Sequence, residues 1–342
     1  MPYLTHPDRL DGLLPGEPPY RVHQLRDWLY RTPVLAASAM TNLPGDLRQR
    51  LGPLWPFTIE AEQADDGGQT VKWLMRAPDG ASYEAVLMAY PDRNTLCLSS
   101  QAGCALGCTF CATGQFGFER HLAAGEMVAQ VAYASARLRH EPIPGSRERV
   151  GNVVFMGMGE PLANYDQLRE ALRRLIEEMG ISGRSITVST VGVVPGIRRL
   201  AAEPWPLTLA LSLHAADDDL RSRLVPLNHR YPIDELISAA RHYLEAKGRR
   251  LTLEWVLIAG VNDTPEQARG LASIAAELKA HCNVIPLNPT PLTDYRAPTR
   301  AAVTAFVDQV RRAGANVTLR ETRGRRIDAA CGQLRTRHAA AR

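Results

Sequence analysis

Lysine and long apolar runs are both scarce in this sequence. Lysine occurs only at positions 72, 247 and 279 of 342 residues, so arginine carries nearly all of the positive charge. No apolar stretch approaches the roughly 20 residues of a membrane-spanning helix, and the first residues, Met1-Pro-Tyr-Leu-Thr-His-Pro-Asp8, lack the charged-then-apolar pattern of a secretory signal. These absences predict a cytoplasmic protein with no membrane partner.

Charge and composition indicate a globular protein but do not show whether it binds nucleic acid. The chain is 45% hydrophobic and 22% charged, with a formal net charge of +4, which is typical of a globular protein of one large domain or two unequal ones. A net charge of this size is too small by itself to predict nucleic-acid binding. Arginine suits phosphate and base stacking because its guanidinium is planar, although genomic base composition also accounts for an arginine-rich sequence.

Six cysteines are present, and three of them form one short run. Cys104, Cys108 and Cys111 are spaced Cys-x3-Cys-x2-Cys, which supplies three ligands where a closed iron–sulfur site uses four. One iron of a cubane cluster would then be open to another ligand. A structural zinc site needs a second ligand pair downstream, a disulfide framework is typical of short secreted chains, and incidental thiols are the plain alternative. Glycines around the run would let a loop bend tightly.

Two helices and a hairpin are predicted before residue 90. Apolar residues recur at helical spacing over 20–30, and 43–51 is predicted to be a short helix with Pro44 near its start. Apolar runs at 69–76 and 82–89 flank the turn sequence Ala77-Pro-Asp-Gly80 and predict a β-hairpin. Residues 1–89 are therefore expected to form an accessory domain.

From about residue 93 the predicted strands and helices alternate, which indicates an α/β fold with a parallel sheet. The expected strands are 95–99, 152–156, 185–189, 207–213, 251–258, 283–286 and 316–320. The expected helices are 123–140, 165–179, 233–247, 265–280 and 300–313. This core is expected to span 90–326, followed by a C-terminal segment at 327–342.

Ligand-binding residues are expected just after these strands, because α/β proteins place their sites at the carboxyl ends of parallel strands. The candidates are Gly159 and Glu160, Ser189, the run Ser212-Leu213-His214, and Asn288 in a proline-bounded loop. The glycine permits a close backbone approach, and the carboxylate, hydroxyls, imidazole and amide suit a nucleoside ligand. Each residue alone is equally typical of a hydrogen-bonded polar group at a strand end or turn.

The cysteine run, with Phe110 before its last cysteine, resembles the radical S-adenosylmethionine (SAM) superfamily. Gly157-Met-Gly-Glu-Pro161 is similar to that superfamily's motif for the amino group of SAM. From about residue 20 to 335 the chain resembles the RlmN/Cfr family of radical SAM RNA methyltransferases. This narrower resemblance rests on Glu84, Cys97 and Cys331, and on Met40-Thr-Asn-Leu-Pro44, Ser99-Ser-Gln-Ala-Gly103, Val188-Ser-Thr190, Gly192-Val-Val-Pro195, Leu211-Ser-Leu-His-Ala215 and Val225-Pro-Leu-Asn228.

The resemblance implies a fold, a ligand set and cofactors. The fold would be a partial (βα)6 radical SAM barrel, with a small N-terminal helical domain and hairpin that bind RNA. Cys104, Cys108 and Cys111 would hold a [4Fe-4S] cluster with one open iron, and each turnover would use two equivalents of SAM. The SAM contacts would be Gly159, Glu160, Ser189, Ser212, Leu213, His214 and Asn288.

The resemblance also implies a covalent route to methylation of adenine C2. One SAM would methylate Cys331 in an ordinary displacement. The second would give a 5′-deoxyadenosyl radical that takes a hydrogen atom from the S-methyl group, and the resulting carbon radical would add to the adenine. After loss of an electron, Cys97 would remove the proton and resolve the adduct, leaving a Cys97–Cys331 disulfide. Glu84 would be the proton acceptor near the base.

The implied substrates are 23S rRNA, before ribosome assembly is complete, and tRNA. The implied electron donor is a reducing protein such as flavodoxin, and the protein is expected to be a monomer. Two alternatives are a C8-specific adenine methyltransferase of the antibiotic-resistance branch and a non-catalytic iron–sulfur electron-transfer or RNA-binding protein. Glu160, Cys97 and Cys331 together argue against the second.

Two remaining features carry weaker expectations. The basic segment 320–326 is a candidate phosphate contact, although charge runs are usually solvated faces. Within it, Arg325 and Arg326 precede the segment of Cys331, and Arg326 stands where family members often carry an acidic residue. Cys282 matches no family role and is expected in the core.

Overall fold

The chain turns sharply at Ala77-Pro-Asp-Gly80, as the sequence predicts. In the computed structural model, which describes residues 1–288, 293–320 and 334, β2 (Thr70–Arg76) and β3 (Ser82–Ala89) pair antiparallel across this turn. The Ala77 N–H donates to the Ala81 carbonyl, and Gly80 has a φ of 90°, which glycine adopts without strain. A third strand, β1 (Thr58–Asp65), pairs antiparallel with β2.

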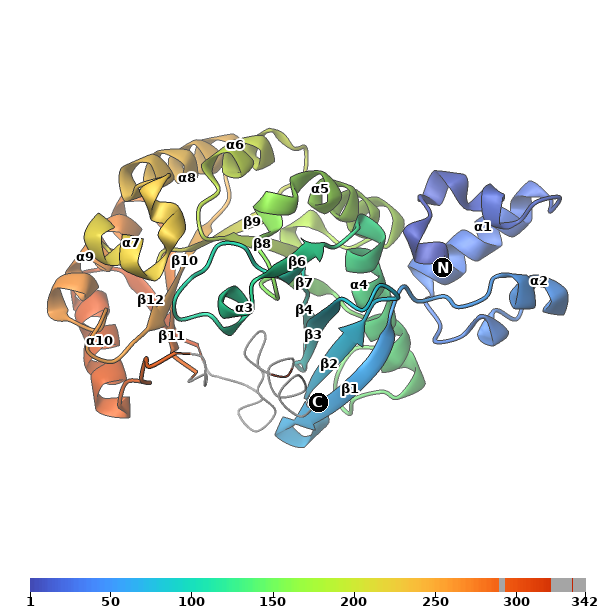
Figure 1. Cartoon of the computed structure of the whole chain (residues 1–342), viewed down its shortest axis with the longest axis horizontal. Coiled ribbons are helices and arrows are strands. Elements are labelled where there is room, and N and C mark those ends of the chain that lie inside the picture. Colours follow the sequence, from blue (N-terminus) through green and yellow to red (C-terminus); the bar gives the residue numbers. More distant parts are fainter. Residues whose placement is uncertain (289–292, 321–333, 335–342) are drawn as a thin grey trace. The chain divides into compact units, whose positions relative to one another are not determined.

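Two compact units make up the chain (Figure 1). The first contains Met1–Ala102, Glu119–Met158 and Asn164–Ile186. The second contains Gly103–Phe118, Gly159–Ala163 and the described residues of Thr187–Arg342.

The first unit continues its sheet from the hairpin into parallel strands. Its strand order is β1-β2-β3-β4-β7, in which β4 (Asn94–Cys97) pairs antiparallel with β3 and parallel with β7 (Asn152–Phe155). Its helices are α1 (Pro19–Arg26), α2 (Gly45–Arg50), α4 (Ala124–His140) and α5 (Tyr165–Arg173). The core of this unit includes stacked and edge-on contacts among Tyr3, Trp55, Phe57, Trp73 and Tyr133.

The second unit has the alternating strands and helices that the sequence predicts. Neighbouring strands are parallel in the order β8-β9-β10-β11-β12. The strands are β8 (Ile186–Thr190), β9 (Thr208–Ser212), β10 (Leu251–Leu257), β11 (His281–Pro286) and β12 (Asn316–Leu319). The helices are α3 (Ala112–Gln115), α6 (Val194–Ala202), α7 (Asp218–Leu224), α8 (Ile233–Lys247), α9 (Pro265–Glu277) and α10 (Arg300–Arg312). A short ribbon of β5 (Gln101–Gly103) and β6 (Phe118–His121) flanks the cysteine run.

Local end signals account for the helix bounds. α8 ends at Lys247 because Gly248 adopts a left-handed conformation with φ of 57°. α9 begins after Thr264, whose side chain accepts from the Gln267 N–H. The expected helix 165–179 continues past α5 as a wider π turn over Arg174–Glu178. Among the described residues, no helix is long and apolar enough to cross a membrane.

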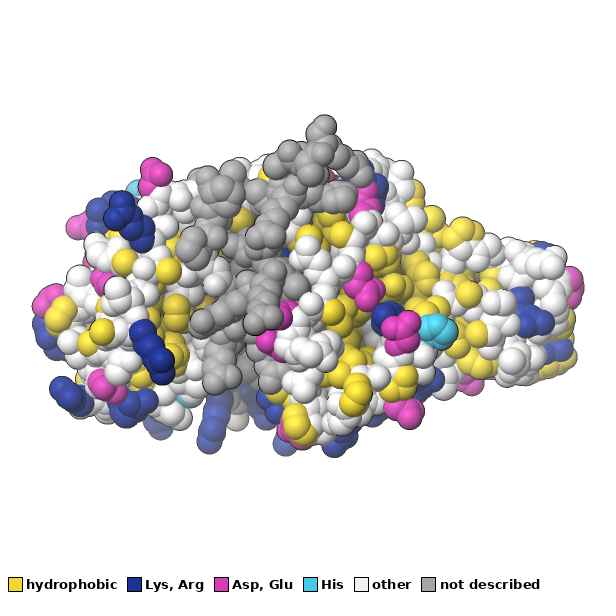
Figure 2. Space-filling view, turned by 90° about the horizontal axis from the view of Figure 1, so that it is seen from below, with side chains coloured by type: hydrophobic (Ala, Val, Ile, Leu, Met, Phe, Trp, Pro, Cys, Tyr) yellow, Lys and Arg dark blue, Asp and Glu magenta, His cyan; other side chains and the backbone are white. Residues whose placement is uncertain are grey.

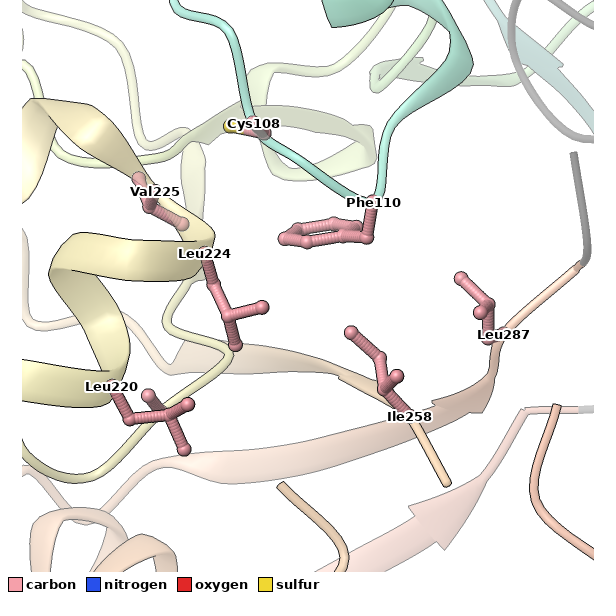
Figure 3. Packing of buried hydrophobic residues seen from close by; sticks show 8 residues of the cluster. Cys108, Phe110, Leu220, Leu224, Val225, Ile258 and Leu287 are labelled. Atoms are coloured by element: carbon pink, nitrogen blue, oxygen red, sulfur yellow. The ribbon is translucent and has the colours of Figure 1, made fainter. Parts of the chain in front are cut away.

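An apolar cluster in the second unit joins the cysteine run to α7 (Figure 3). The ring of Phe110 faces Leu224 of α7 and Ile258 and Leu287, which directly follow β10 and β11. Cys108 belongs to the same cluster. The loop that carries the cysteines is therefore packed onto the ends of the parallel strands.

Candidate active site

Close backbone contacts hold the ends of the cysteine loop together. The Cys104 N–H donates to the Gly117 carbonyl at 2.9 Å. A Cβ at Gly103, which has a φ of +80°, would lie 2.0 Å from that same carbonyl oxygen, so only glycine fits there. Inside the loop, a Cβ at Gly114 would lie 3.1 Å from the backbone nitrogen of Cys108.

The three thiols of this loop come from one short segment, and three cysteines are a donor set that suits an iron–sulfur cluster. In the part of the chain that the structure describes, no three His, Cys, Asp or Glu side chains converge as one ion would require. A cubane instead takes each cysteine on a separate iron. Burial raises the pKa of Cys104 to about 11 and that of Cys108 well above its usual value, and neighbouring thiols raise both further. Such thiols give up their protons when iron binds.

Glu160 is a buried carboxylate beside this loop. Its Oε1 accepts from the Leu162 N–H at 3.0 Å and its Oε2 from the Val191 N–H at 2.9 Å, while its own backbone N–H donates to Cys104. Burial raises the pKa of Glu160 to about 7, against the two amides that favour the charged form. The motif residue thus connects the cysteine loop to the segment after β8.

Other candidate residues lie at the carboxyl ends of neighbouring strands of the second unit. The Oγ atoms of Ser189, on β8, and Ser212, which ends β9, are 3.4 Å apart. Leu213 is fully buried and donates its N–H to the Glu254 carbonyl of β10. Asn288 is half-buried just after β11. The parallel register brings these ends to one edge, as the sequence predicts.

His214 is buried and neutral in this arrangement. Its Nδ1 accepts from the Val256 N–H at 3.1 Å, and its ring meets Phe110 edge-on with centroids 4.7 Å apart. Burial, with the charge of Arg221, lowers the pKa of His214 to about 3. His214 also has a φ of 62°, which is unusual for a residue other than glycine. The fold thus holds this residue in a strained conformation next to the cysteine loop.

In the first unit, Glu84 lies on β3 and forms a buried ion pair with Lys72. The Lys72 Nζ is 2.9 Å from the Glu84 Oε2, and the two side chains are 0% and 3% exposed. Cys97, on β4, lies opposite Val86, and Lys72 on β2 also lies opposite Val86. Because directly opposed residues share a face and side chains alternate along a strand, Glu84, Lys72 and Cys97 share one face of the sheet.

Some predicted residues cannot be placed, and two important ones were missed. Cys331, Arg325 and Arg326 lie outside the described residues. Cys282 is fully buried on β11, as expected of a core residue. Sequence reasoning did not single out Lys72 or Arg221; the only signal for Lys72 was a lysine within an apolar strand.

The chain is similar to known RNA methyltransferases over nearly its whole length. The radical SAM superfamily profile matches residues 98–272. A probable dual-specificity RNA methyltransferase RlmN from Frankia alni is 49% identical over 93% of this chain and 78% of its own length. The protein of the same name from Chloroflexus aurantiacus is 48% identical over 94% of this chain and 89% of its own length.

A solved structure agrees with the assignment. The crystal structure of a radical SAM methyltransferase from Sphaerobacter thermophilus superposes with a TM-score of 0.90 at 48% identity, covering 97% of this chain and 98% of that one. The fold is therefore the radical SAM α/β fold. The chain belongs to the RlmN family of RNA methyltransferases within the radical SAM superfamily.

Proposed function

We propose that this RNA methyltransferase methylates C2 of an adenine in 23S rRNA and of an adenine in tRNA anticodon loops. Family membership implies an RNA substrate, a [4Fe-4S] cluster and SAM. The observation that carries the finer proposal is the shared sheet face of Glu84 and Cys97, because the reaction needs an acid–base group and a thiol near one base. Residues 1–89 would contribute to RNA binding.

The cofactor would be held by residues of the second unit. Cys104, Cys108 and Cys111 would ligate the cluster, which supplies the electron that cleaves SAM to a 5′-deoxyadenosyl radical. Glu160 would accept hydrogen bonds from the SAM amino group, since its carboxylate is already oriented by two backbone amides. Ser189, Ser212, Leu213, His214 and Asn288 would surround the nucleoside part, with Gly159 allowing a close backbone approach.

The methyl group would reach the base through Cys331. We propose that Cys331 is methylated by one SAM and then donates its methylene carbon to the adenine after hydrogen abstraction. After the adduct radical loses one electron to the oxidised cluster, Cys97 would remove the proton from the attacked carbon. Its thiolate would then attack the Cys331 sulfur, so that the bond between that sulfur and the methylene carbon breaks, the carbon takes up a proton and the methylated base is released. Cys97 is buried on β4, opposite Val86 of β3. Glu84 would accept a proton near the base, and its ion pair with Lys72 holds the carboxylate in place on the sheet face that it shares with Cys97.

The surface supports a polyanionic partner. At the left end of Figure 2, where Figure 1 has α9 and α10, Lys and Arg side chains lie among Asp and Glu side chains. Arg300, Arg311 and Arg312 of α10 are exposed. Arginines of this kind contact phosphates and bases.

The remaining parts of the proposal concern the oligomeric state and the partners. The protein would be a monomer, its electron donor would be a protein such as flavodoxin, and it would act on rRNA before ribosome assembly is complete.

The test is the identity of the methylated carbon. We would incubate the anaerobically reconstituted protein with SAM, a reductant and either 23S rRNA or tRNA, then digest the RNA and separate its adenosines by liquid chromatography and mass spectrometry. The proposal expects 2-methyladenosine from both RNAs. 8-Methyladenosine would instead assign the chain to the C8-specific activity, and product from rRNA alone would remove the tRNA part.

A further inference from the structure

α7 connects the cysteine loop to the segments that follow β8 and β9. The carbonyl of Leu224, the last residue of α7, accepts from the Thr109 N–H at 3.0 Å, between two of the cluster cysteines. Leu220 and Leu224 also pack in the apolar cluster with Cys108 and Phe110 (Figure 3). One turn before the end of the helix stands Arg221, which is 1% exposed.

The guanidinium of Arg221 binds both strand-end segments at once. Its Nη2 donates to the carbonyls of Val191 at 2.6 Å and Ser212 at 3.4 Å, and its Nε donates to the Leu213 carbonyl at 3.1 Å. Val191 follows β8 and donates its N–H to Glu160, and Ser212 and Leu213 are two of the proposed SAM contacts. A single side chain therefore fixes the backbone of two segments, through three carbonyls, around the proposed SAM site.

A fourth hydrogen bond, to Asn228, orients the guanidinium of Arg221. Arg221 Nη1 donates to the Asn228 Oδ1 at 2.7 Å, and the Asn228 Nδ2 donates to the Asp218 Oδ1 at 2.8 Å and the Ser222 Oγ at 2.9 Å. All four acceptors of Arg221 among the described residues are thus neutral carbonyl groups. At longer range its charge interacts with that of Asp218, and with that of Cys108 when this thiol loses its proton. Burial lowers the pKa of Arg221 to about 10, so it is still a cation at neutral pH.

A buried cation whose hydrogen bonds all go to neutral groups has its charge available to its surroundings. Its field acts on His214, whose pKa it lowers, and on the thiol of Cys108. A cluster gains one negative charge when it is reduced, so a nearby positive charge favours the reduced form. The same charge would therefore favour reduction of the cluster by its electron donor, the step that must precede SAM cleavage.

We propose that Arg221 is a positioning residue that fixes the SAM-binding segments to the cluster loop and raises the reduction potential of the cluster through its charge. The proposal rests on the cluster and SAM contacts assigned under the proposed function, but it does not depend on which RNA or which carbon is methylated. In this proposal Arg221 itself makes no contact with the reacting atoms.

Two substitutions separate the two roles. Arg221→Gln removes both the charge and the planar set of guanidinium donors, whereas Arg221→Lys keeps the charge and loses that set of donors. Arg223→Gln is the matched control, because Arg223 is an exposed arginine on the same helix. For each reconstituted protein we would measure iron and sulfide content, SAM binding by equilibrium dialysis, and the midpoint potential by a redox titration followed by electron paramagnetic resonance.

We expect SAM binding to weaken about tenfold or more in Arg221→Gln and Arg221→Lys, because neither side chain can donate to all of the buried carbonyls that the guanidinium bonds. We expect a lower midpoint potential in Arg221→Gln, a wild-type potential in Arg221→Lys, and wild-type values throughout in Arg223→Gln. Unchanged SAM affinity in Arg221→Lys would overturn the positioning role, and this variant keeps the test valid where Arg221→Gln fails to take up iron. Equal midpoint potentials in wild type and Arg221→Gln would overturn the role of the charge. An equally lowered midpoint potential in Arg221→Gln and Arg221→Lys would overturn it too.

Discussion

Lys72 and Glu84 form an ion pair in the interior of the first unit, with Nζ and Oε2 2.9 Å apart and both side chains almost inaccessible to solvent. Lys72 is one of only three lysines in the chain. The pair shares a sheet face with Cys97. A change in the packing of the β2–β3 hairpin would therefore also move residues that the proposed reaction uses.

Removing one partner of this pair is expected to be costly. Lys72→Met leaves the Glu84 carboxylate buried without its cation and should lower the free energy of unfolding by about 3–5 kcal/mol, measured by urea denaturation. The double variant Lys72→Met/Glu84→Gln should recover most of that loss. Arg137→Met, which breaks a more exposed pair with Glu62, should cost under about 1 kcal/mol. Equal losses for the Lys72 and Arg137 variants would show that burial does not strengthen the Lys72–Glu84 pair.

The two thiols of the proposed relay should fail in different ways. Cys331→Ala removes the methyl carrier, so RNA methylation should fall to background while 5′-deoxyadenosine is still formed from SAM. Cys97→Ala leaves the carrier but removes the group that releases the product, so a protein–RNA crosslink should accumulate. Gel electrophoresis before and after nuclease treatment detects it as a shifted band. Methylation by Cys331→Ala would disprove the covalent route, and Cys282→Ala is the buried-thiol control for general damage.

His214 should make the protein sensitive to acid. Its pKa is lowered to about 3 in the fold by burial, so the unfolded chain takes up a proton at this residue at pH values where the folded chain does not. Stability is therefore complete above the ordinary histidine pKa and is lost as the pH falls, by about 1.4 kcal/mol per pH unit. Urea unfolding at a series of pH values measures this slope.

The matched variants for this slope are two histidine substitutions. His214→Asn keeps an acceptor for the Val256 N–H without a titrating ring and should flatten the pH dependence. His229→Asn changes an exposed histidine and should leave the slope as it is. A wild-type slope in His214→Asn would assign the acid sensitivity to other groups.

Of the two glycines at the ends of the cysteine loop, Gly103 should tolerate alanine less well than Gly117. Gly103→Ala combines a positive φ with a Cβ 2.0 Å from the Gly117 carbonyl, whereas Gly117→Ala has a similar φ of +83° and open space around the Cβ. Gly103→Ala should therefore lose most of its bound iron after reconstitution, and Gly117→Ala should retain more. Iron and sulfide analysis measures both, and equal iron content in the two variants would show that the close contact does not matter.

The regular parts of the second unit were predictable because their signals are local. The helix predicted at 233–247 is confirmed as α8, since its apolar spacing and the glycine after it are both visible in the sequence. The strand ends with Ser189 and Ser212 were predictable because parallel strands that alternate with helices expose their carboxyl ends at one edge. The β1 strand was missed because charged and polar residues, such as Glu60, Glu62 and Gln63, hide its alternation.

The partners of buried charges were not predictable in the same way. Lys72 and Arg221 are each specified by groups from distant parts of the sequence: a carboxylate on the next strand for one, and carbonyls after two different strands for the other. No local pattern distinguishes such residues from solvated ones. Only the three-dimensional arrangement shows that their charges are enclosed.

The contact between Gly103 and Gly117 bears on how the cluster is acquired. A loop that must bring three separate thiols to one cubane loses conformational entropy when its ends meet. Here the Cys104–Gly117 hydrogen bond and the packing of Phe110 on α7 stabilise the closed loop and so offset this loss of entropy. If these thiols hold the proposed cluster, less of the free energy of iron–thiolate bonding would be needed to order the loop, and the cluster would be bound more tightly.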